Sequence, residues 1–154
     1  MEVREIHPNE LEKLLLLYTY LHDNAMPTID DSIKMLWNKI ISDPDHHIIV
    51  CVEQEEIISS CILLIIPNLT HGQRPYALIE NVVTSAHHRN KGHATKVLEF
   101  AREIAIKEGC YKIMLMTGSK EESVLGFYEH AGYNQNDKTA FIQWLETFTT
   151  SLHT

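Results

Sequence analysis

The segment Arg89-Asn90-Lys91-Gly92-His93-Ala94 has the residue types of an anion-binding turn. It lies between an apolar run typical of a strand and a long amphipathic stretch, so several backbone N–H groups are expected at a helix N-terminus. Gly92 and Ala94 are small enough to let a ligand approach the backbone, while Arg89 and Lys91 add positive charge. The sequence therefore predicts a phosphate or pyrophosphate site. The alternative is an ordinary helix start with two surface cations.

The nucleotide-binding loops with better-defined spacing are missing from the chain. No G-x-x-x-x-G-K-[ST] occurs, because Gly118-Ser119-Lys120 lacks the earlier glycine of that motif. No G-x-G-x-x-G occurs either. Their absence weakens the hypothesis of a dinucleotide or nucleotide phosphate binder but leaves it open.

Hydrophobic spacing predicts the elements that would position this turn. It predicts strands at residues 2–6, 47–52, 57–66, 76–84, 112–117 and 140–145. It predicts helices that start after Asn9 and after Asp30-Asp31, that follow the turn at residues 85–91 and run to Gly109, and that span residues 121–131. Asn9 and Glu12 form a capping-box-like start for the first helix, and residues 67–75 form a loop that could border a substrate site.

The order of these elements predicts the fold class. Strand, long helix and strand across residues 76–117 make a βαβ unit, whose strands should be parallel neighbours with a right-handed crossover. The polar turn at residues 53–56 joins a hairpin. We therefore expect an α/β fold with a mixed, largely antiparallel sheet, a central parallel βαβ unit and helices on both faces. One domain should cover residues 1–146, followed by a loose tail at residues 147–154.

Composition excludes several classes of protein. The 154 residues are 44% hydrophobic, and 13 basic against 21 acidic residues give a formal charge of −8. Such a chain does not favour nucleic-acid binding, because phosphate neutralisation needs a basic face, whereas cationic partners such as amines would be attracted. No apolar run approaches the roughly 18 residues of a membrane span. Three widely spaced cysteines, Cys51, Cys61 and Cys110, indicate free thiols in a reducing, cytoplasmic compartment.

The ten histidines do not form a recognisable metal site. His46-His47 and His87-His88 are adjacent pairs whose side chains would diverge on a strand. No HExxH motif and no cysteine and histidine cluster at ligand spacing occurs. We expect no metal ion.

Two motifs resemble the GCN5-related N-acetyltransferase (GNAT) family. Arg89-x-x-Gly92-x-Ala94 fits the family's [Q/R]-x-x-G-x-[G/A] turn, which binds the pyrophosphate of acetyl-CoA. Phe127-Tyr128-Glu129-His130-Ala131-Gly132-Tyr133 is similar to the family's F-Y-E-x-x-G-[F/Y] ending. The resemblance covers roughly residues 76–145, whereas residues 1–75 match only in the order of elements. It implies a GNAT-like fold with acetyl-CoA as co-substrate and a primary amine as acceptor.

The resemblance also implies which residues hold acetyl-CoA. They are Val82, Val83 and Thr84 on the strand, Arg89, Asn90, Lys91, Gly92, His93, Ala94 and Thr95 in the turn, and Ser119. The pantetheine amides would pair with the backbone of residues 82–84 as an added strand, and the N–H of Val83 would polarise the thioester carbonyl. His93 stands at the variable position of the motif and should contribute only its backbone.

Two side chains are candidates for proton transfer to and from the substrates. Tyr128 resembles the family's general acid, since a phenol with a pKa near 10 is matched to a departing thiolate; a core aromatic on a helix stripe is the alternative. Glu80 is the candidate base, because a carboxylate in an apolar strand is costly without a function; a structural ion pair or an edge-facing glutamate is the alternative. Strand alternation would place Glu80 and Val82 on one face, and Asn81 and Val83 on the other.

One departure from the family leaves a second function open. Many members carry an asparagine seven residues before the tyrosine, and this chain has Glu121 there, which Ser119 or Ser123 could replace. The main hypothesis is an N-acetyltransferase acting on an amine, a small molecule in preference to a protein amino group. The alternative is a non-catalytic acyl-CoA sensor or regulatory module. A homodimer is compatible with the family, although the sequence shows no interface.

Overall fold

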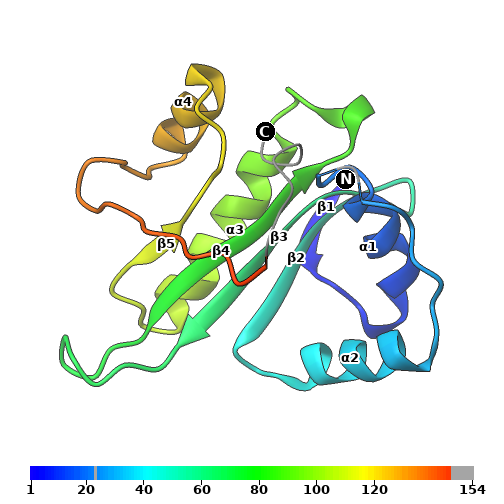
Figure 1. Ribbon diagram of the computed structural model, residues 1–154, viewed down its shortest axis with the longest axis horizontal. Coiled ribbons are helices and arrows are strands. Elements are labelled where there is room, and N and C mark those ends of the chain that lie inside the picture. The colour runs from blue at the N-terminus through cyan, green and yellow to red at the C-terminus, as the bar shows by residue number, and fades with distance from the viewer. Residues whose placement is uncertain (23, 147–154) are drawn as a thin grey trace. The chain divides into compact units, whose positions relative to one another are not determined.

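The computed structural model describes residues 1–22 and 24–146, and the expected tail at residues 147–154 lies outside the described residues. The chain divides after Leu115 into two compact units. The first unit holds a five-stranded sheet in the order β1-β2-β3-β4-β5 (Figure 1). Its strands are β1 (Glu2–Glu5), β2 (His46–Glu53), β3 (Glu56–Ile66), β4 (Tyr76–Thr84) and β5 (Ile113–Leu115). β1 to β4 pair antiparallel and β4 pairs parallel with β5, which confirms the expected mixed sheet.

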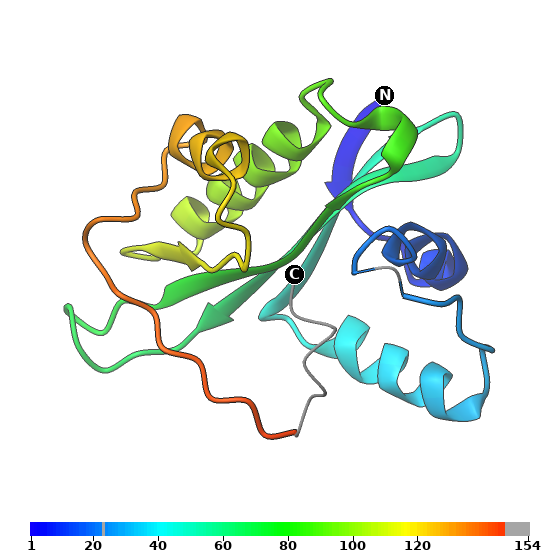
Figure 2. The same ribbon diagram turned by 45° about the horizontal axis from the view of Figure 1, so that its top comes forward.

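Helices cover both faces of this sheet in the first unit (Figure 2). They are α1 (Leu11–Tyr18), which follows the 3₁₀ turn η1 (Pro8–Glu10), α2 (Asp31–Ser42), and α3 (His93–Lys107), which follows the 3₁₀ turn η2 (Ala86–His88). α1 and α2 lie on one face, and their core cluster is Leu14, Leu17, Trp37, Ile48, Val50, Ile57 and Val83. α3 lies on the other face, where it buries Val97, Leu98, Ala101 and Ala105. The second unit contains α4 (Glu122–His130).

Local signals set the ends of these elements. The Asp30 carboxylate accepts the backbone N–H of Ile33 at 2.9 Å and caps α2 as expected. α3 ends before Gly109, which has a φ of 77° and supplies the left-handed residue of a helix C-terminus. The first helix differs from the expectation. The capping box belongs to the 3₁₀ turn η1, where the Glu10 carboxylate accepts the N–H of His7 at 2.9 Å, and no side-chain hydrogen bond caps α1 itself.

The strand predicted at residues 140–145 is wrong, because this segment takes no strand conformation in the structure. Alternating apolar residues provide strand propensity, but a strand also requires a neighbour that pairs with it. The strand predicted at residues 112–117 is likewise shorter, at Ile113–Leu115. No helix among the described residues is long and apolar enough to cross a membrane.

A β-bulge interrupts β4 at Asn81 and changes which side chains share a face. Ile62 pairs with Glu80, whereas Ser60 pairs with Val83, so β4 has one residue more than β3 between these pairs. Asn81 has a φ of 50°, in the left-handed region. Because cross-strand partners share a face, Glu80 lies on the same face as Val83. The alternation expected from the sequence, which grouped Glu80 with Val82, is therefore wrong.

Candidate functional site

The second half of β4 has a free edge in the first unit. Pairing with β5 covers only the three residues from Ala77 to Ile79. From Glu80 to Thr84 the strand continues, bonded to β3 on its other side. Ser59 anchors this half, because its hydroxyl donates to the carbonyl of Val83 at 3.0 Å and lies 2.9 Å from the Thr84 hydroxyl. The residues predicted to receive an added strand, Val82 to Thr84, are thus held rigidly beside an open edge.

The turn after β4 presents the N-terminus of α3. Asn90 and Gly92 have φ angles of 61° and 81°, so the backbone makes a left-handed turn before His93. Within the described chain, no hydrogen bond is donated by the backbone N–H groups of residues 91–95. A Cβ at Gly92 would meet no atom within 4 Å, so the space in front of the turn is open. These features fit an anionic group at the helix N-terminus.

Positive charge gathers at this turn in an otherwise acidic chain. The Arg89 guanidinium donates to the carbonyl of Thr84 at 3.3 Å and so ties the turn back to β4. Lys91 and Lys96 are exposed, and both act electrostatically on the imidazole of His93. Before the turn, the Nε2 of His88 lies 3.8 Å from a carboxylate oxygen of Glu53. The turn therefore offers backbone donors and cations together, which is the combination that a pyrophosphate requires.

His93 has a structural role that the sequence did not reveal. Its side chain is 7% exposed, and its Nδ1 lies 3.8 Å from the Sγ of Cys51 on β2. Burial lowers the pKa of His93, Glu53 opposes this shift, and His88 and the lysines act in the same direction as burial, so the neutral imidazole is favoured. His93 thus anchors the first turn of α3 to the sheet. Its neighbour lies 42 residues away in sequence, so spacing alone carried no signal of this contact.

The α1 face of the bulge carries a second residue that the sequence did not single out. The hydroxyl of Tyr18 is buried beside the Asn81 side chain. Burial raises the pKa of this phenol to about 12, and the Asn81 side chain opposes the shift. Tyr18 therefore stays protonated and has a polar neighbour at the bulge. Glu80 lies on this same face of the sheet. Its side chain is exposed, so a substrate can reach it.

The other predicted site residues belong to the second unit. Tyr128 lies on α4 and is half-buried. Its ring centroid lies 5.0 Å from that of Phe127 and 6.4 Å from that of Tyr133. The Ser119 hydroxyl accepts the backbone N–H of Glu121 at 3.2 Å and so helps to start α4. Glu121 is exposed at the position of the family asparagine. The aromatic packing holds the Tyr128 ring in place within its unit.

Comparison with known protein families shows to which family this chain belongs. Residues 10–133 match the model described as the acetyltransferase (GNAT) family. The chain belongs to this family. A protein of Agrobacterium tumefaciens str. C58 assigned as an acetyltransferase is 35% identical, with a TM-score of 0.86, covering 94% of this chain and 100% of that one. A Trypanosoma brucei acetyltransferase is 25% identical, with a TM-score of 0.79 and coverage of 93% and 99%.

A third solved structure shares the GNAT fold at lower identity. The glucosamine-6-phosphate N-acetyltransferase of Arabidopsis thaliana is 22% identical, with a TM-score of 0.81 and coverage of 94% and 98%. In this GNAT protein the β4 bulge, the open β4 edge and the left-handed turn all lie in the first unit, between residues 80 and 95. No group of three histidine, cysteine, aspartate or glutamate side chains that could hold a metal ion occurs among the residues that the structure describes.

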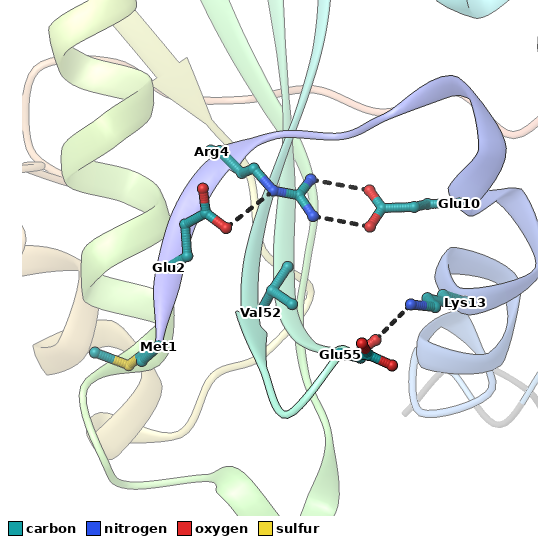
Figure 3. Close-up of a pocket in the computed structure, with 7 residues that line it drawn as sticks. All are labelled: Met1, Glu2, Arg4, Glu10, Lys13, Val52 and Glu55. Atoms are coloured by element: carbon teal, nitrogen blue, oxygen red, sulfur yellow. Dashed lines mark hydrogen bonds and ion pairs between the residues drawn. The ribbon is translucent and has the colours of Figure 1, made fainter.

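A polar recess lies at the N-terminal edge of the sheet of this GNAT protein (Figure 3). Arg4 forms a two-pronged pair with the Glu10 carboxylate, at 2.9 and 2.8 Å, and a longer contact with Glu2 at 3.4 Å. Lys13 donates from its Nζ to the backbone carbonyl of Glu55 at 2.6 Å. The hydrogen bonds from Arg4 lower the pKa of Glu10 to about 2. Arg4 and Glu10 thus neutralise each other, and their pair joins β1 to η1.

Replacing Glu10 by glutamine should destabilise the fold. Glu10→Gln removes the charge and leaves Arg4 half-buried with one weaker partner, for an expected loss of about 1–3 kcal/mol in unfolding free energy at pH 7. Because the pKa of Glu10 is lowered from 4.5 to about 2, its contribution is fully present above pH 4.5 and disappears as the pH falls through 2. Urea denaturation from pH 7 to 2 measures the difference between the two proteins.

The matched control for this measurement is Glu55→Gln in the same recess. The Glu55 side chain is exposed and only its backbone carbonyl is used, so the unfolding free energy should change by less than about 0.5 kcal/mol. Equal stability of Glu10→Gln and the wild type at pH 7 would contradict a stabilising role for this ion pair.

Proposed function

We propose that this GNAT protein transfers the acetyl group of acetyl-CoA to a primary amine by direct attack. The observation that carries the proposal is the left-handed turn at Asn90 and Gly92, which leaves the N–H groups of residues 91–95 free beside two lysines. A pyrophosphate fits these donors. The open β4 edge begins within a few residues of the turn, so one extended ligand could contact both.

In this proposal each part of the site binds a different part of the co-substrate. The turn residues 89–95 hold the pyrophosphate, and the backbone of Val82 to Thr84 pairs with the amides of the pantetheine arm. The N–H of Val83 donates to the thioester carbonyl, and Ser119 assists at the thiol end. Acetyl-CoA supplies an acetyl group activated as a thioester.

The proton transfers are assigned to two side chains. Glu80, exposed on the α1 and α2 face, accepts a proton from the ammonium form of the acceptor, either directly or through a water molecule. The amine nitrogen then forms a bond to the acetyl carbon as the carbon–sulfur bond breaks. Tyr128 donates its proton to the departing thiolate, so that the products are an amide and a neutral thiol.

The net charge supports the proposed acceptor, and the free cysteines support the proposed cellular compartment. An acidic protein attracts cationic amines, and we propose a small-molecule amine in preference to a protein amino group. The described cysteines, Cys51, Cys61 and Cys110, are all free, which supports a reducing compartment such as the cytoplasm. Residues 1–146 would act together as one acyltransferase domain.

Thermal unfolding with acetyl-CoA, followed by thiol release in the same sample, tests the proposal. A ligand that binds only the native protein raises the melting temperature, and 100-fold excess over Kd corresponds to about 2.7 kcal/mol. We expect a clear rise with acetyl-CoA and thiol release that depends on one or more members of a panel of primary amines. NAD or ATP should give no rise at the same concentration.

The other outcomes separate the alternatives. A rise in melting temperature without thiol release from any amine would favour the acyl-CoA sensor, for which the replacement of the family asparagine by Glu121 is the supporting observation. No rise at saturating acetyl-CoA would exclude the co-substrate. An equal rise with NAD or ATP would point instead to a general nucleotide phosphate binder.

A further inference from the structure

The bulge in β4 holds Asn81 in a conformation that strand residues rarely adopt. Its φ of 50° lies in the left-handed region, which asparagine reaches more easily than most residues but still at a cost. A strained residue of this kind persists only where the surrounding structure fixes it. The contacts around the bulge therefore decide whether β4 keeps its extra residue.

The β3 partner of the bulge is fixed from the α3 side of the sheet. Cys61 stands on β3 between Ser60 and Ile62, the residues that pair with β4 on either side of the bulge. It is fully buried, and its thiol donates to the carbonyl of Val97 on α3 at 3.6 Å. This contact holds β3 in place opposite the bulge, rather than Asn81 itself.

Tyr18 reaches the bulge from the other face of the sheet, where α1 lies (Figure 2). It is the last residue of α1, and its side chain packs against the core cluster that contains Val83. Its hydroxyl is buried beside the Asn81 side chain. Burial raises the pKa of the phenol and Asn81 opposes the rise, as a donor beside the phenolic oxygen does. Separating two such buried polar groups is unfavourable, because each loses a polar neighbour.

We propose that Tyr18 is a positioning residue, which holds Asn81 in the bulge and so keeps Glu80 and Val83 on the same face of the sheet. This role rests on the proposed function, in which Glu80 accepts the proton of the ammonium group and the Val83 N–H donates to the thioester carbonyl. Without the bulge, regular alternation would turn Glu80 and Val83 to opposite faces. Tyr18 itself touches no substrate, because its hydroxyl is buried.

Amide hydrogen exchange measured by NMR tests the hold on the bulge without any turnover. Tyr18→Phe removes only the hydroxyl, so we expect the amides of residues 80–84 to exchange roughly tenfold faster relative to those of β2. Comparison with β2 separates local loosening of β4 from a loss of global stability, which would speed exchange in both strands alike. An unchanged ratio between the two strands would overturn the proposal, whether or not the protein acetylates an amine.

The matched control for the exchange measurement is Tyr20→Phe. Tyr20 lies just beyond the end of α1 and is 38% exposed, so loss of its hydroxyl should leave the exchange of both strands unchanged. An equal effect of Tyr20→Phe and Tyr18→Phe on β4 would contradict a specific hold by Tyr18. Circular dichroism verifies that both variants are folded.

Steady-state kinetics tests whether the hold on the bulge serves acetyl transfer. Tyr18→Phe should lower kcat about tenfold, because Glu80 and the Val83 N–H lose their alignment, while the Kd for acetyl-CoA stays within about threefold. A kcat within about twofold of the wild type would rule out the positioning role. Absence of thiol release by the wild-type protein with every amine would contradict the proposed function instead, and the exchange ratio would still decide whether Tyr18 holds the bulge.

A double-mutant cycle with Asn81→Gly shows whether Tyr18 acts through Asn81. Glycine adopts the left-handed conformation without a side chain, so Tyr18 has nothing left to hold. We expect Asn81→Gly to lower kcat by about three- to tenfold, and Tyr18→Phe to add less than about twofold in that background. Losses that multiply in the double variant would show that Tyr18 and Asn81 act independently and would refute the proposed route.

Discussion

Tyr128→Phe is expected to lower kcat for acetyl transfer by about 10²- to 10⁴-fold while leaving the Kd for acetyl-CoA within about twofold. The substitution removes only the phenolic hydroxyl, so the ring stays packed between Phe127 and Tyr133. Without the proton donor, the thiolate must leave as an anion. Steady-state kinetics with the amine identified from the panel, together with calorimetric titration of acetyl-CoA, measures the two quantities separately.

Tyr133→Phe is the matched control for this substitution. It removes the hydroxyl of a neighbouring tyrosine that lies in the same unit, 6.4 Å from the Tyr128 ring, and should change kcat by less than about threefold. If both variants lose activity equally, the effect is one of packing. If Tyr128→Phe retains kcat within threefold of the wild type, Tyr128 is not the general acid.

Gly92→Val should weaken acetyl-CoA binding by about 100-fold or more. Gly92 has a φ of 81°, which a β-branched residue adopts only with strain, so the turn would relax and move the N–H groups at the start of α3 out of alignment. Hydrogen bonds to a charged group contribute about 1.5–3 kcal/mol each, and the loss of two accounts for this factor. The Kd from calorimetric titration is the measurement.

Gly72→Val separates loss of the ligand site from backbone strain. Gly72 has a φ of 68°, and a Cβ there meets no atom within 4 Å, as at Gly92, but it lies in the loop between β3 and β4. Both valine variants should lose roughly 1–2 kcal/mol of stability, and only Gly92→Val should lose affinity. Equal Kd values for the two variants would show that the turn does not bind the pyrophosphate.

Much of the first unit could be predicted from local sequence. The apolar run of β4 and its bounds, the Asp30 cap of α2, the end of α3 at Gly109 and the βαβ unit follow from side-chain periodicity and from residues with restricted backbone angles. The turn before α3 was equally readable from the polar residues around Gly92, and its binding of an anion stays a prediction.

Other features were decided by contacts between distant parts of the chain. The bulge at Asn81 depends on the register of β4 against β3, and this register moved Val83 to the face of Glu80. His93 is buried because Cys51 on β2 lies beside it. Segment 140–145 has a strand's alternation but no strand, since pairing needs a partner edge. Sequence periodicity determined which segments have helix or strand propensity. Register, burial and strand pairing depend instead on contacts between residues that only the tertiary structure brings together.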